Sequence, residues 1–600
     1  MERLYEMKQN KIKMTHTIKF KLLKIIGLLL FLTPILHAKT TIEIKHQAGD
    51  MTSNIRAALE EIEDKEIVLV FEEAVYEFLP DYAVGKYCFI TNHDNGYKKI
   101  IFPLEGFDSV EIEGNGAELI FHGQTFPFQF HNCQSIQIKD LTIDWDTPFT
   151  FQGEVMGFSE EENWIDFKPS KEDFSWNFRK GRFTFPNIDG YAFSSLGSSL
   201  YFDAEHKRVA HGAYDFTSNP KSVEKLKGGV FRIHESKKRK HYPPLGSILN
   251  FQGTKGANSD APAFQVTNSK DIHFDKVIIH HALGMGFLFE RSENITLSNC
   301  GVHLRDDTPR VISATADATH FCNCKGDILV ENCRFENMLD DGTNVHGTYV
   351  EVDEVLDEYT ARVALKHFQQ SGFEFAGAGD EIWFIHQPDP QRKTTNTVKE
   401  VKTLNDTYSI IHFADKLPEG TRKGDLLENK TWNPTFTMRG CTIRDHRARN
   451  IVIKTPKKIV IENNKLSSMM SSILFRGESF YWFESGSVED VLIQNNHFNY
   501  CAYSGSEHAV MYVTPRLGKA YDSSISFDRN IRFINNTIET FDQRIVIADR
   551  VDGLTITNNT ITHTPTEKPL YPDTPTFDLT NCTNVKISGN TYKGGYKKSE

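Results

Sequence analysis

The sequence has no basic stretch of the kind that binds nucleic acids. Its 600 residues hold 68 Lys and Arg against 80 Asp and Glu, a formal net charge of −12. Nucleic-acid-binding domains instead concentrate Lys and Arg on one face. The one basic tract, "KKRKH" at 237–241, is more typical of a solvated loop than of a binding patch. We therefore expect no nucleic-acid partner.

Cysteine is too sparse to build a disulfide framework. Nine cysteines are spread over the chain, an odd number at wide spacings, whereas disulfide scaffolds are short chains with even, regular counts. Cys322-Asn-Cys324 does not provide the four recurring ligands of a closed zinc site. We interpret the thiols as small buried apolar groups, and we expect neither a metal nor a cofactor.

Long apolar runs are absent after the N-terminus. Lys19, Lys21 and Lys24 precede an apolar run at 25–36, and Ala38 follows it. This order is typical of a secretory signal peptide, and the run is short for a membrane span. We therefore predict export, to the periplasm or the medium, after cleavage near residue 38. The alternative is an uncleaved anchor; the mature chain is not expected to span a membrane.

A short segment of alternating residues recurs along the chain. Nine copies are visible, each ending in a polar corner: "SIQIKDLTI" from Ser135, "DIHFDKVII" from Asp271, "NITLSNCGV" from Asn294, "DILVENCRF" from Asp327, "KIVIENNKL" from Lys458, "DVLIQNNHF" from Asp490, "NIRFINNTI" from Asn530, "GLTITNNTI" from Gly553 and "NVKISGNTY" from Asn584. Alternation at period two indicates strands, and asparagine tolerates the backbone angles of a tight corner. Repeats of this kind indicate a solenoid.

The spacing of the corners specifies the kind of solenoid. Asn464, Asn496, Asn536, Asn559 and Asn590 are separated by 32, 40, 23 and 31 residues. Coils of about 23 residues, some lengthened by loops, predict an all-β fold: a right-handed parallel β-helix whose asparagines stack at about 4.8 Å. A β-sandwich is the alternative, but the hairpin signals it requires are rare here.

Two stretches interrupt the repeat and read as small inserted antiparallel β units resembling barrels. The predicted organisation is a signal peptide (1–38), N-terminal coils (39–146), a first insertion (147–250), central coils (251–349), a second insertion (350–433) and C-terminal coils (434–600). Insertions in solenoids gather on one face and often shape a binding site.

The densest polar signal lies in the central coils. Asp317 precedes Asp340 by 23 residues, one minimal coil, and Asp341 follows directly. Equivalent positions on adjacent coils lie about 5 Å apart, so Asp317 and Asp340 are expected to meet, with flexible Gly342 letting Asp341 join them. Crowded carboxyls raise one pKa, as a general acid requires. The alternative for "Asp-Asp-Gly" alone is a solvated turn.

Other side chains accompany these acids. Candidate substrate contacts include histidines next to the acids and an aromatic ring suited to the apolar face of a sugar. Two arginines on a later coil are two residues apart, so both can face the same side of a strand and donate to sugar hydroxyls. The alternatives are structural histidines, a solvated basic edge and packing between coils. The candidates are His320, Asn344, His346, Arg447, Arg449, Trp482 and Glu484.

Several motifs resemble glycoside hydrolase family 110, bacterial exo-acting α-1,3-galactosidases. They are "DWDTPFTFQGEV", "HALGMGF", "TADATHF" and "NMLDDGTNVHGTYV", in the family's order. The resemblance implies a parallel β-helix with β-barrel insertions, no cofactor, and inverting release of terminal α-galactose from blood-group B or linear Gal-α-1,3-Gal glycans. Asn450, where glycine is expected, departs from the family and affects details of the sugar pocket.

By the same resemblance Asp317, Asp340 and Asp341 are the catalytic carboxylates. An analogy to polygalacturonases makes Asp340 the general acid, with Asp317 and Asp341 holding the attacking water. Inverting carboxyl pairs generally lie about 6.5–9.5 Å apart, and about 5 Å indicates retention. The alternatives are a polygalacturonase-like hydrolase, a uronate lyase, or a non-enzymatic adhesin. The sequence leaves open the choice between fucosylated and linear substrates, and the oligomeric state.

Overall fold

The computed structural model describes residues 39–170, 176–185, 190, 195–253 and 260–599. The predicted signal peptide lies outside the described residues. The chain divides into two units at residue 41, and the fold described below is that of the second, Ile42–Glu600. No helix within the described ranges is both long and apolar enough to cross a membrane.

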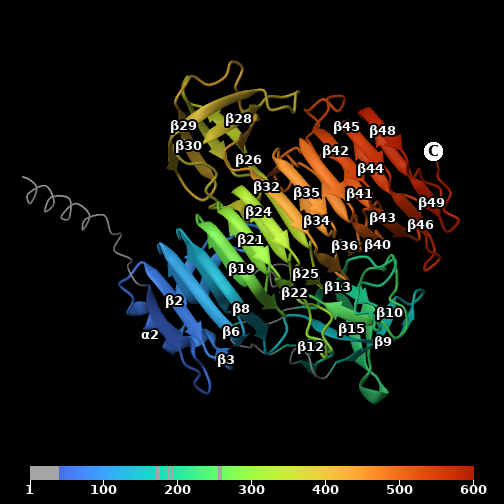
Figure 1. The fold of residues 1–600 in the computed structure, drawn as a ribbon. Helices are drawn as coiled ribbons and strands as arrows, with labels where there is room; N and C mark the ends of the chain where they lie inside the picture. The colour runs from blue at the N-terminus through green and yellow to red at the C-terminus, as the bar shows by residue number, and fades with distance from the viewer. Residues whose placement is uncertain (1–38, 171–175, 186–189, 191–194, 254–259, 600) are drawn as a thin grey trace, which may run out of the picture. The chain divides into compact units, whose positions relative to one another are not determined.

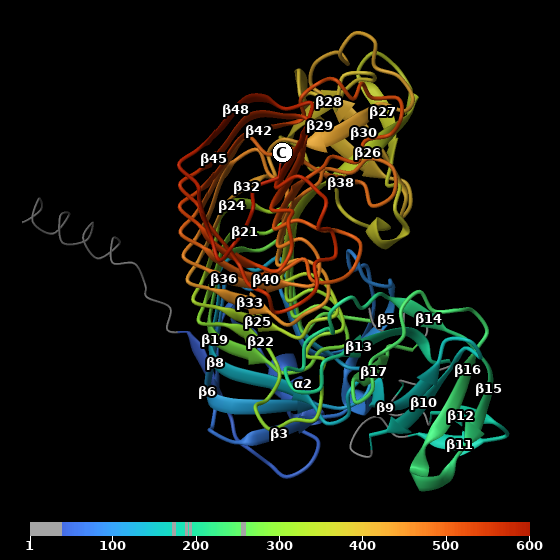
Figure 2. The same cartoon turned by 90° about the vertical axis from the view of Figure 1, so that its right-hand side faces the viewer.

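The second unit is wound as a parallel β-helix (Figure 1). One coil consists of β23 (Thr319–Cys322), β24 (Lys325–Glu331) and β25 (Arg334–Glu336). In the coils on either side, β24 pairs in parallel with β21 (Glu293–Ser298) and β32 (Pro434–Arg439). The coils are seen stacked in Figure 2. The predicted β-helix is therefore confirmed.

Parallel strands line the solenoid in two series. The series that carries the asparagine corners contains β2 (Glu66–Phe71), β3 (Val75–Phe78), β6 (Ser109–Phe121), β8 (Ile136–Trp145), β19 (Lys270–Ile279), β21, β22 (Gly301–Val302), β24, β25, β32, β33 (Thr442–Arg444), β35 (Lys458–Glu462), β36 (Lys465–Ser468), β39 (Asp490–Gln494), β40 (His497–Cys501), β42 (Asp528–Ile534), β43 (Thr537–Thr540), β45 (Val551–Thr557), β46 (Thr560–His563), β48 (Thr583–Ser588) and β49 (Thr591–Lys593). The other series contains β5 (Gly96–Glu105), β7 (Phe126–His131), β18 (Phe264–Thr267), β20 (Phe287–Glu290), β23, β26 (Thr343–Val355), β34 (Ile451–Ile453), β37 (Ile473–Phe475), β41 (Met511–Val513), β44 (Val546–Asp549) and β47 (Phe577–Thr580). The second series supplies the strands beneath the site described below.

The predicted asparagine ladder is present. The side-chain amide of Asn464 donates to the amide oxygen of Asn496 at 2.9 Å, and the bonds continue through Asn536 and Asn559 to Asn590. The residue before each of the first four rungs turns the chain with a positive φ of 56–58°, at Asn463, Asn495, Asn535 and Asn558, and Gly589 does so before Asn590 with a φ of 69°. Each rung satisfies buried polar groups that water cannot reach.

A column of phenylalanine rings runs from the N-terminal coils into the central coils. The rings of Phe102, Phe128, Phe264 and Phe287 stack in sequence, with centroids 4.3, 4.7 and 5.4 Å apart. These phenylalanines occupy equivalent inward positions on successive coils. Eight of the nine cysteines are buried free thiols, in keeping with their interpretation as small apolar groups.

The first insertion is a seven-stranded antiparallel sheet in the order β14-β13-β17-β9-β10-β16-β15. Its strands are β9 (Phe151–Ser159), β10 (Trp164–Pro169), β13 (Gly197–Phe202), β14 (Phe216–Ser218), β15 (Pro220–Lys225), β16 (Phe231–Glu235) and β17 (Ile248–Phe251). The boundaries predicted for this insertion, 147 and 250, lie close to the ends of these strands.

The second insertion grows directly out of a solenoid strand. After pairing with β23 and β34, β26 leaves the solenoid and joins a ring in which β26, β27, β30, β29, β28 and β31 pair in turn and β31 returns to β26. The added strands are β27 (Thr360–Ala364), β28 (Glu381–Ile385), β29 (Thr394–Thr403), β30 (Tyr408–Phe413) and β31 (Leu426–Asn429). The barrel is therefore anchored next to the central coils.

Candidate active site

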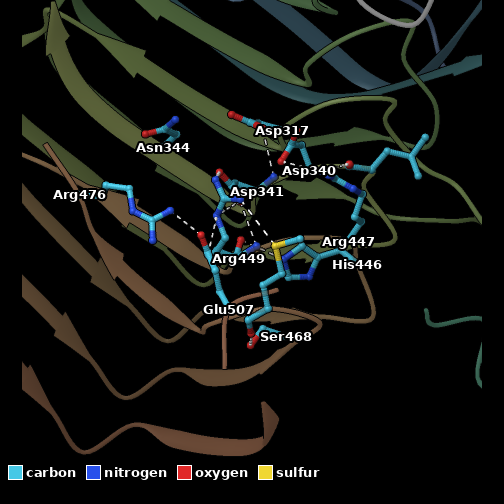
Figure 3. Close-up of polar contacts among 12 residues, drawn as sticks. Asp317, Asp340, Asp341, Asn344, His446, Arg447, Arg449, Ser468, Arg476 and Glu507 are labelled. Atoms are coloured by element: carbon cyan, nitrogen blue, oxygen red, sulfur yellow. Dashed lines mark hydrogen bonds and ion pairs between the residues drawn. The ribbon is translucent and has the colours of Figure 1, made fainter. Parts of the chain in front are cut away.

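The three predicted aspartates meet in one cavity of about 760 Å³. One carboxylate oxygen from each of Asp317, Asp340 and Asp341 lies within 4.8 Å of the others. Figure 3 shows the three side chains converging beside Arg447 and Arg449. Like charges held this closely cannot all ionise freely.

The register of the coils differs by one residue from the prediction. β23 pairs with β26 so that His320 lies opposite Asn344, a coil of 24 residues rather than 23. Asp317 is thus equivalent to Asp341, not to Asp340, and the Asp341 backbone N–H donates to Asp317 Oδ1 at 3.1 Å. The next coil places Arg449 at the equivalent position. The predicted equivalence of Asp317 and Asp340 is wrong, although the two still meet.

Gly342 is required for space. A Cβ atom at this position would lie 2.6 Å from both the backbone oxygen of Asn450 and the side chain of Ile443. Its φ is not among the positive angles of the chain, so the flexibility expected of this glycine is not what the turn uses. The close approach of the next coil explains glycine after the two aspartates.

Two arginines compensate the charge of the cluster. The backbone N–H and Nη2 of Arg449 donate to the two oxygens of Asp341, each at 3.0 Å. Arg447 Nη1 lies 3.3 Å from Asp340 Oδ1, and its Nη2 donates to Asp215 at 2.8 Å. Both predicted arginines therefore contact the acids. Three carboxylates could also hold a hard cation, but these guanidinium groups already supply positive charge.

Burial raises the pKa of two carboxyls well above the usual range. For Asp317 the desolvation is reinforced by the charge of Asp340. For Asp341 desolvation outweighs the opposing charge of Arg449, and Asp340 adds to the increase. Asp340 itself is half exposed, with 43% of its side chain accessible. The site therefore combines two buried carboxyls with one that faces the cavity.

The two predicted histidines lie behind the cavity surface. His320 and His346 are 0% and 3% exposed, and neither lines the cavity. His320 Nδ1 is 2.8 Å from Asp317 Oδ2, and its Nε2 is 2.8 Å from His346 Nε2. Because neither ring reaches the cavity, the prediction that they bind the sugar needs correction: His320 contacts Asp317, and His346 contacts His320.

The remaining predicted residues do line the cavity. Trp482 is 37% exposed at its edge. Glu484 forms a short ion pair with Lys454, whose Nζ lies 3.5 Å from the side-chain oxygen of Asn344. Burial acts to raise the pKa of Glu484, but His346 and Lys454 outweigh it, so the pKa lies below its usual range.

Sequence reasoning missed several lining residues. Arg476 and Glu507 form a buried ion pair beside Arg449. Arg476 directly follows a strand and is two residues after Leu474, whose side chain faces outward. Alternation along the strand could therefore have placed Arg476 on the cavity side, whereas Glu507 lies in a loop without a periodic pattern. Asn92 and Gln369 also line the cavity, and the Asn92 backbone N–H donates to the Gln369 oxygen. Contacts between loops so distant in sequence leave no local signal.

Comparison with known proteins agrees with this architecture. The chain matches profiles described as GLAA-B beta-barrel domain I over residues 151–249, GLAA-B beta-barrel domain II over 360–427 and right-handed beta helix region over 426–598. The two barrel matches lie within the two insertions, and the third begins at the last strand of the second insertion and covers most of the C-terminal coils.

Three relatives match most of the chain. Alpha-1,3-galactosidase A of Shewanella woodyi is 31% identical over 88% of this chain and 85% of its own length. Alpha-1,3-galactosidase B of Bacteroides thetaiotaomicron is 30% identical over the same shares, 88% and 85%. Alpha-1,3-galactosidase B of Phocaeicola vulgatus is 30% identical over 91% and 93%. The chain belongs to the α-1,3-galactosidases, glycoside hydrolase family 110.

Proposed function

We propose that the protein is an exo-acting enzyme that releases terminal α-1,3-linked galactose from glycans, using Asp317, Asp340 and Asp341. The observation that carries the proposal is the meeting of these three carboxyls within 4.8 Å on the wall of a cavity. Glycoside hydrolysis needs one carboxylic acid on the glycosidic oxygen and a second carboxylate on the other side of the reaction.

Asp340 is the proposed general acid. It is the most exposed of the three, and it can therefore reach the oxygen between the galactose and the next sugar. Asp317 and Asp341 are joined by the Asp341 N–H···Asp317 bond and together hold the attacking water. Arg449 keeps the Asp341 carboxylate oriented.

The proposed inversion of the anomeric centre follows from the resemblance to the family. The oxygen separations, within 4.8 Å, are shorter than the 6.5–9.5 Å between carboxyl groups of most inverting pairs, and nearer to the 5 Å of retaining pairs. Proton NMR of freshly released galactose decides the matter: β-galactose as the first product supports inversion, and α-galactose contradicts it.

Loops beside the cavity support attack at chain ends. Next to Asn92, the side chain of Asn95 donates to the Ser371 oxygen at 2.9 Å, so a loop of the solenoid is joined to a loop of the second insertion. On another side Gly505 N–H donates to the Ala213 oxygen. A cavity flanked by such loop contacts suits a terminal sugar better than the interior of a polymer.

Charge in the cavity supports a neutral substrate. The acidic side chains are Asp94, Asp317, Asp340, Asp341, Glu478, Glu484 and Glu507, and the basic ones are Arg447, Arg449, Lys454, Arg476 and Arg516. A uronate substrate, as in polygalacturonases and lyases, would favour an excess of basic groups.

The test is hydrolysis of blood-group B trisaccharide and linear Gal-α-1,3-Gal in parallel, with free galactose as the readout. Release from either supports the proposal, and the ratio gives the preference for fucosylated or linear glycans. Polygalacturonate serves as the comparison substrate. No galactose from either glycan, by a folded protein, would contradict the proposal.

We also propose that the protein is exported, on the N-terminal charge and apolar pattern described above. Expression of the full chain followed by cell fractionation and N-terminal sequencing tests this. A mature N-terminus near residue 39 in the exported fraction supports it, whereas an intact Met1 in the cytoplasm contradicts it.

A further inference from the structure

Asp317, His320 and His346 form one chain of hydrogen bonds that ends on a backbone carbonyl. His346 Nδ1 is 2.8 Å from the Gly347 oxygen, the two Nε2 atoms are 2.8 Å apart, and His320 Nδ1 is 2.8 Å from Asp317 Oδ2. All three side chains are buried, with 5%, 0% and 3% exposed. The order of donors in this chain can therefore be derived from its fixed end.

The fixed end is the Gly347 oxygen, which can only accept. His346 Nδ1 must then carry a hydrogen. The contact between the two Nε2 atoms needs one hydrogen, and the contact between His320 Nδ1 and Asp317 needs another. Three contacts thus hold three protons, one more than an ionised aspartate and two neutral histidines carry. The trio therefore has a net charge of zero.

The surroundings favour this charge. Burial lowers the pKa of His320 to about 4 and that of His346 to about 3, while burial raises the pKa of Asp317. The charged groups that face the trio are Glu290, Asp340, Asp341, Arg449, Lys454 and Glu484. His93 nearby is held neutral by its bonds to the Thr91 oxygen and the Met285 N–H. Both shifts, of His320 and of Asp317, favour Asp317 Oδ2 as the position of the additional proton in the resting protein.

We propose that His320 and His346 are positioning residues that let Asp317 act as the base through this shared proton. As the water oxygen bonds to the anomeric carbon, one water proton passes to Asp317 Oδ1 and the Oδ2 proton passes to His320 Nδ1. His320, now protonated on both nitrogens, donates to Asp317 and to His346 Nε2. Asp340 gives its proton to the leaving oxygen, so the positive charge gained by the trio is balanced by the negative charge on Asp340. After the reaction the trio releases its additional proton, and Asp340 then takes up a proton.

This inference rests on the proposed function for its catalytic part, but the proton order can be measured without substrate. Long-range ¹⁵N NMR of the wild-type protein, assigned with His320→Gln and His346→Gln, reports which ring nitrogens carry hydrogens. We expect hydrogen on Nδ1 of His346 and on Nε2 of His320 at pH 7. Hydrogen on Nε2 of His346 would overturn the proposal, even if the enzyme proved to act on another glycan.

Two variants of His346 test the catalytic part on an α-1,3-galactosyl disaccharide. His346→Phe removes the acceptor for His320 Nε2–H, so protonated His320 is less stable and Asp317 is a weaker base. We expect kcat to fall about 10²-fold, the lower end of the usual contribution of general-base catalysis, with little change in KM. The acidic limb of the kcat–pH profile should shift to lower pH. His346→Gln keeps an oxygen acceptor and should restore most of kcat.

Other outcomes contradict the proposal. A higher KM with unchanged kcat in His346→Phe would mean that the ring binds substrate. Equal losses in His346→Phe and His346→Gln, with the wild-type pH profile, would mean that the ring only fills space. Thermal denaturation of both variants shows whether they are folded before kinetics are compared.

Discussion

Asp215, in the first insertion, and Arg447, in the solenoid, form an ion pair in which Nη2 donates to Oδ2 at 2.8 Å. Arg447 Nη1 is also 3.3 Å from Asp340. The guanidinium therefore divides its charge between the proposed acid and a side chain 232 residues away. The insertion can thus influence how Arg447, and through it Asp340, is oriented.

Asp215→Asn should lower kcat by about tenfold. Without the Asp215 carboxylate, Arg447 loses one of its two acidic partners and orients Asp340 less firmly; a small displacement of a catalytic group is enough to cost about tenfold in rate. KM should change little if the sugar does not contact Asp215. Asp490→Asn is the matched control, because Asp490 pairs with Arg532 on the surface of the solenoid. Equal kinetics for both variants would show that the Asp215 pair is only structural.

Asp340→Asn should fold normally, and its kcat should fall about 10²–10⁴-fold, the usual contribution of a general acid. The measurement is kcat on linear Gal-α-1,3-Gal, with thermal denaturation as the test of folding. Asp327→Asn is the control, since Asp327 is an exposed acid of the same coils that bonds Thr435. Wild-type turnover in folded Asp340→Asn would remove Asp340 from the mechanism.

The solenoid could be predicted from sequence because its periodicity is local. Alternating strands and asparagine corners recur in each coil, and the predicted ladder from Asn464 to Asn590 is present. The meeting of Asp317 with the Asp340–Asp341 pair also followed from coil length. The one-residue register error arose because loops between strands vary in length, so one corner spacing does not fix another coil.

The functions of single site residues were harder to predict. His320 and His346 have the sequence context of ligand-binding residues, but they are buried, and burial depends on how the coils and loops pack around them. Asp215 and Glu507 reach the site through contacts between distant segments. Such contacts depend on tertiary packing and leave no periodic signal in the chain.

Asp317→Asn should stabilise the protein relative to wild type, and this gain in stability should be larger at neutral pH than at acid pH. The folded-state pKa of Asp317 is raised, so ionisation favours the unfolded chain as the pH rises above the usual value near 3.8, at about 1.4 kcal/mol for each unit of difference. Asparagine removes this cost, while its amide can still donate to His320 and accept from Asp341. The difference in thermal midpoint between variant and wild type should increase from pH 4 to pH 8.

Asp144→Asn provides a control of opposite sign. Burial acts to raise the pKa of Asp144, but Arg310 and Arg305, whose nitrogens lie 2.9 and 2.6 Å from its oxygens, keep the pKa below its usual range. Its charge therefore stabilises the fold above the unfolded pKa, and this stability is lost as the pH falls. Asp144→Asn should lower the midpoint at pH 7 and have little effect in strong acid. The same pH trend in both variants would contradict the raised pKa of Asp317.

Asn536→Ala should destabilise the C-terminal coils by about 3 kcal/mol. Asn536 is 1% exposed; its oxygen accepts from the backbone and side chain of Asn496, and its amide donates to Asn559 and to the Ile493 oxygen. Each buried group left without a partner costs about 1–3 kcal/mol. Asn499→Ala is the control on the neighbouring coil, since Asn499 is exposed and lies opposite Glu539 of the Asn536 coil, and should stay within about 0.5 kcal/mol. Denaturant unfolding measures the stability of the two variants. Hydrogen exchange should show reduced protection in the coils next to Asn536, because solenoid coils contact mainly their neighbours. Equal stability of the two variants would mean that the hydrogen bonds of the ladder stabilise the fold no more than hydrogen bonds to water.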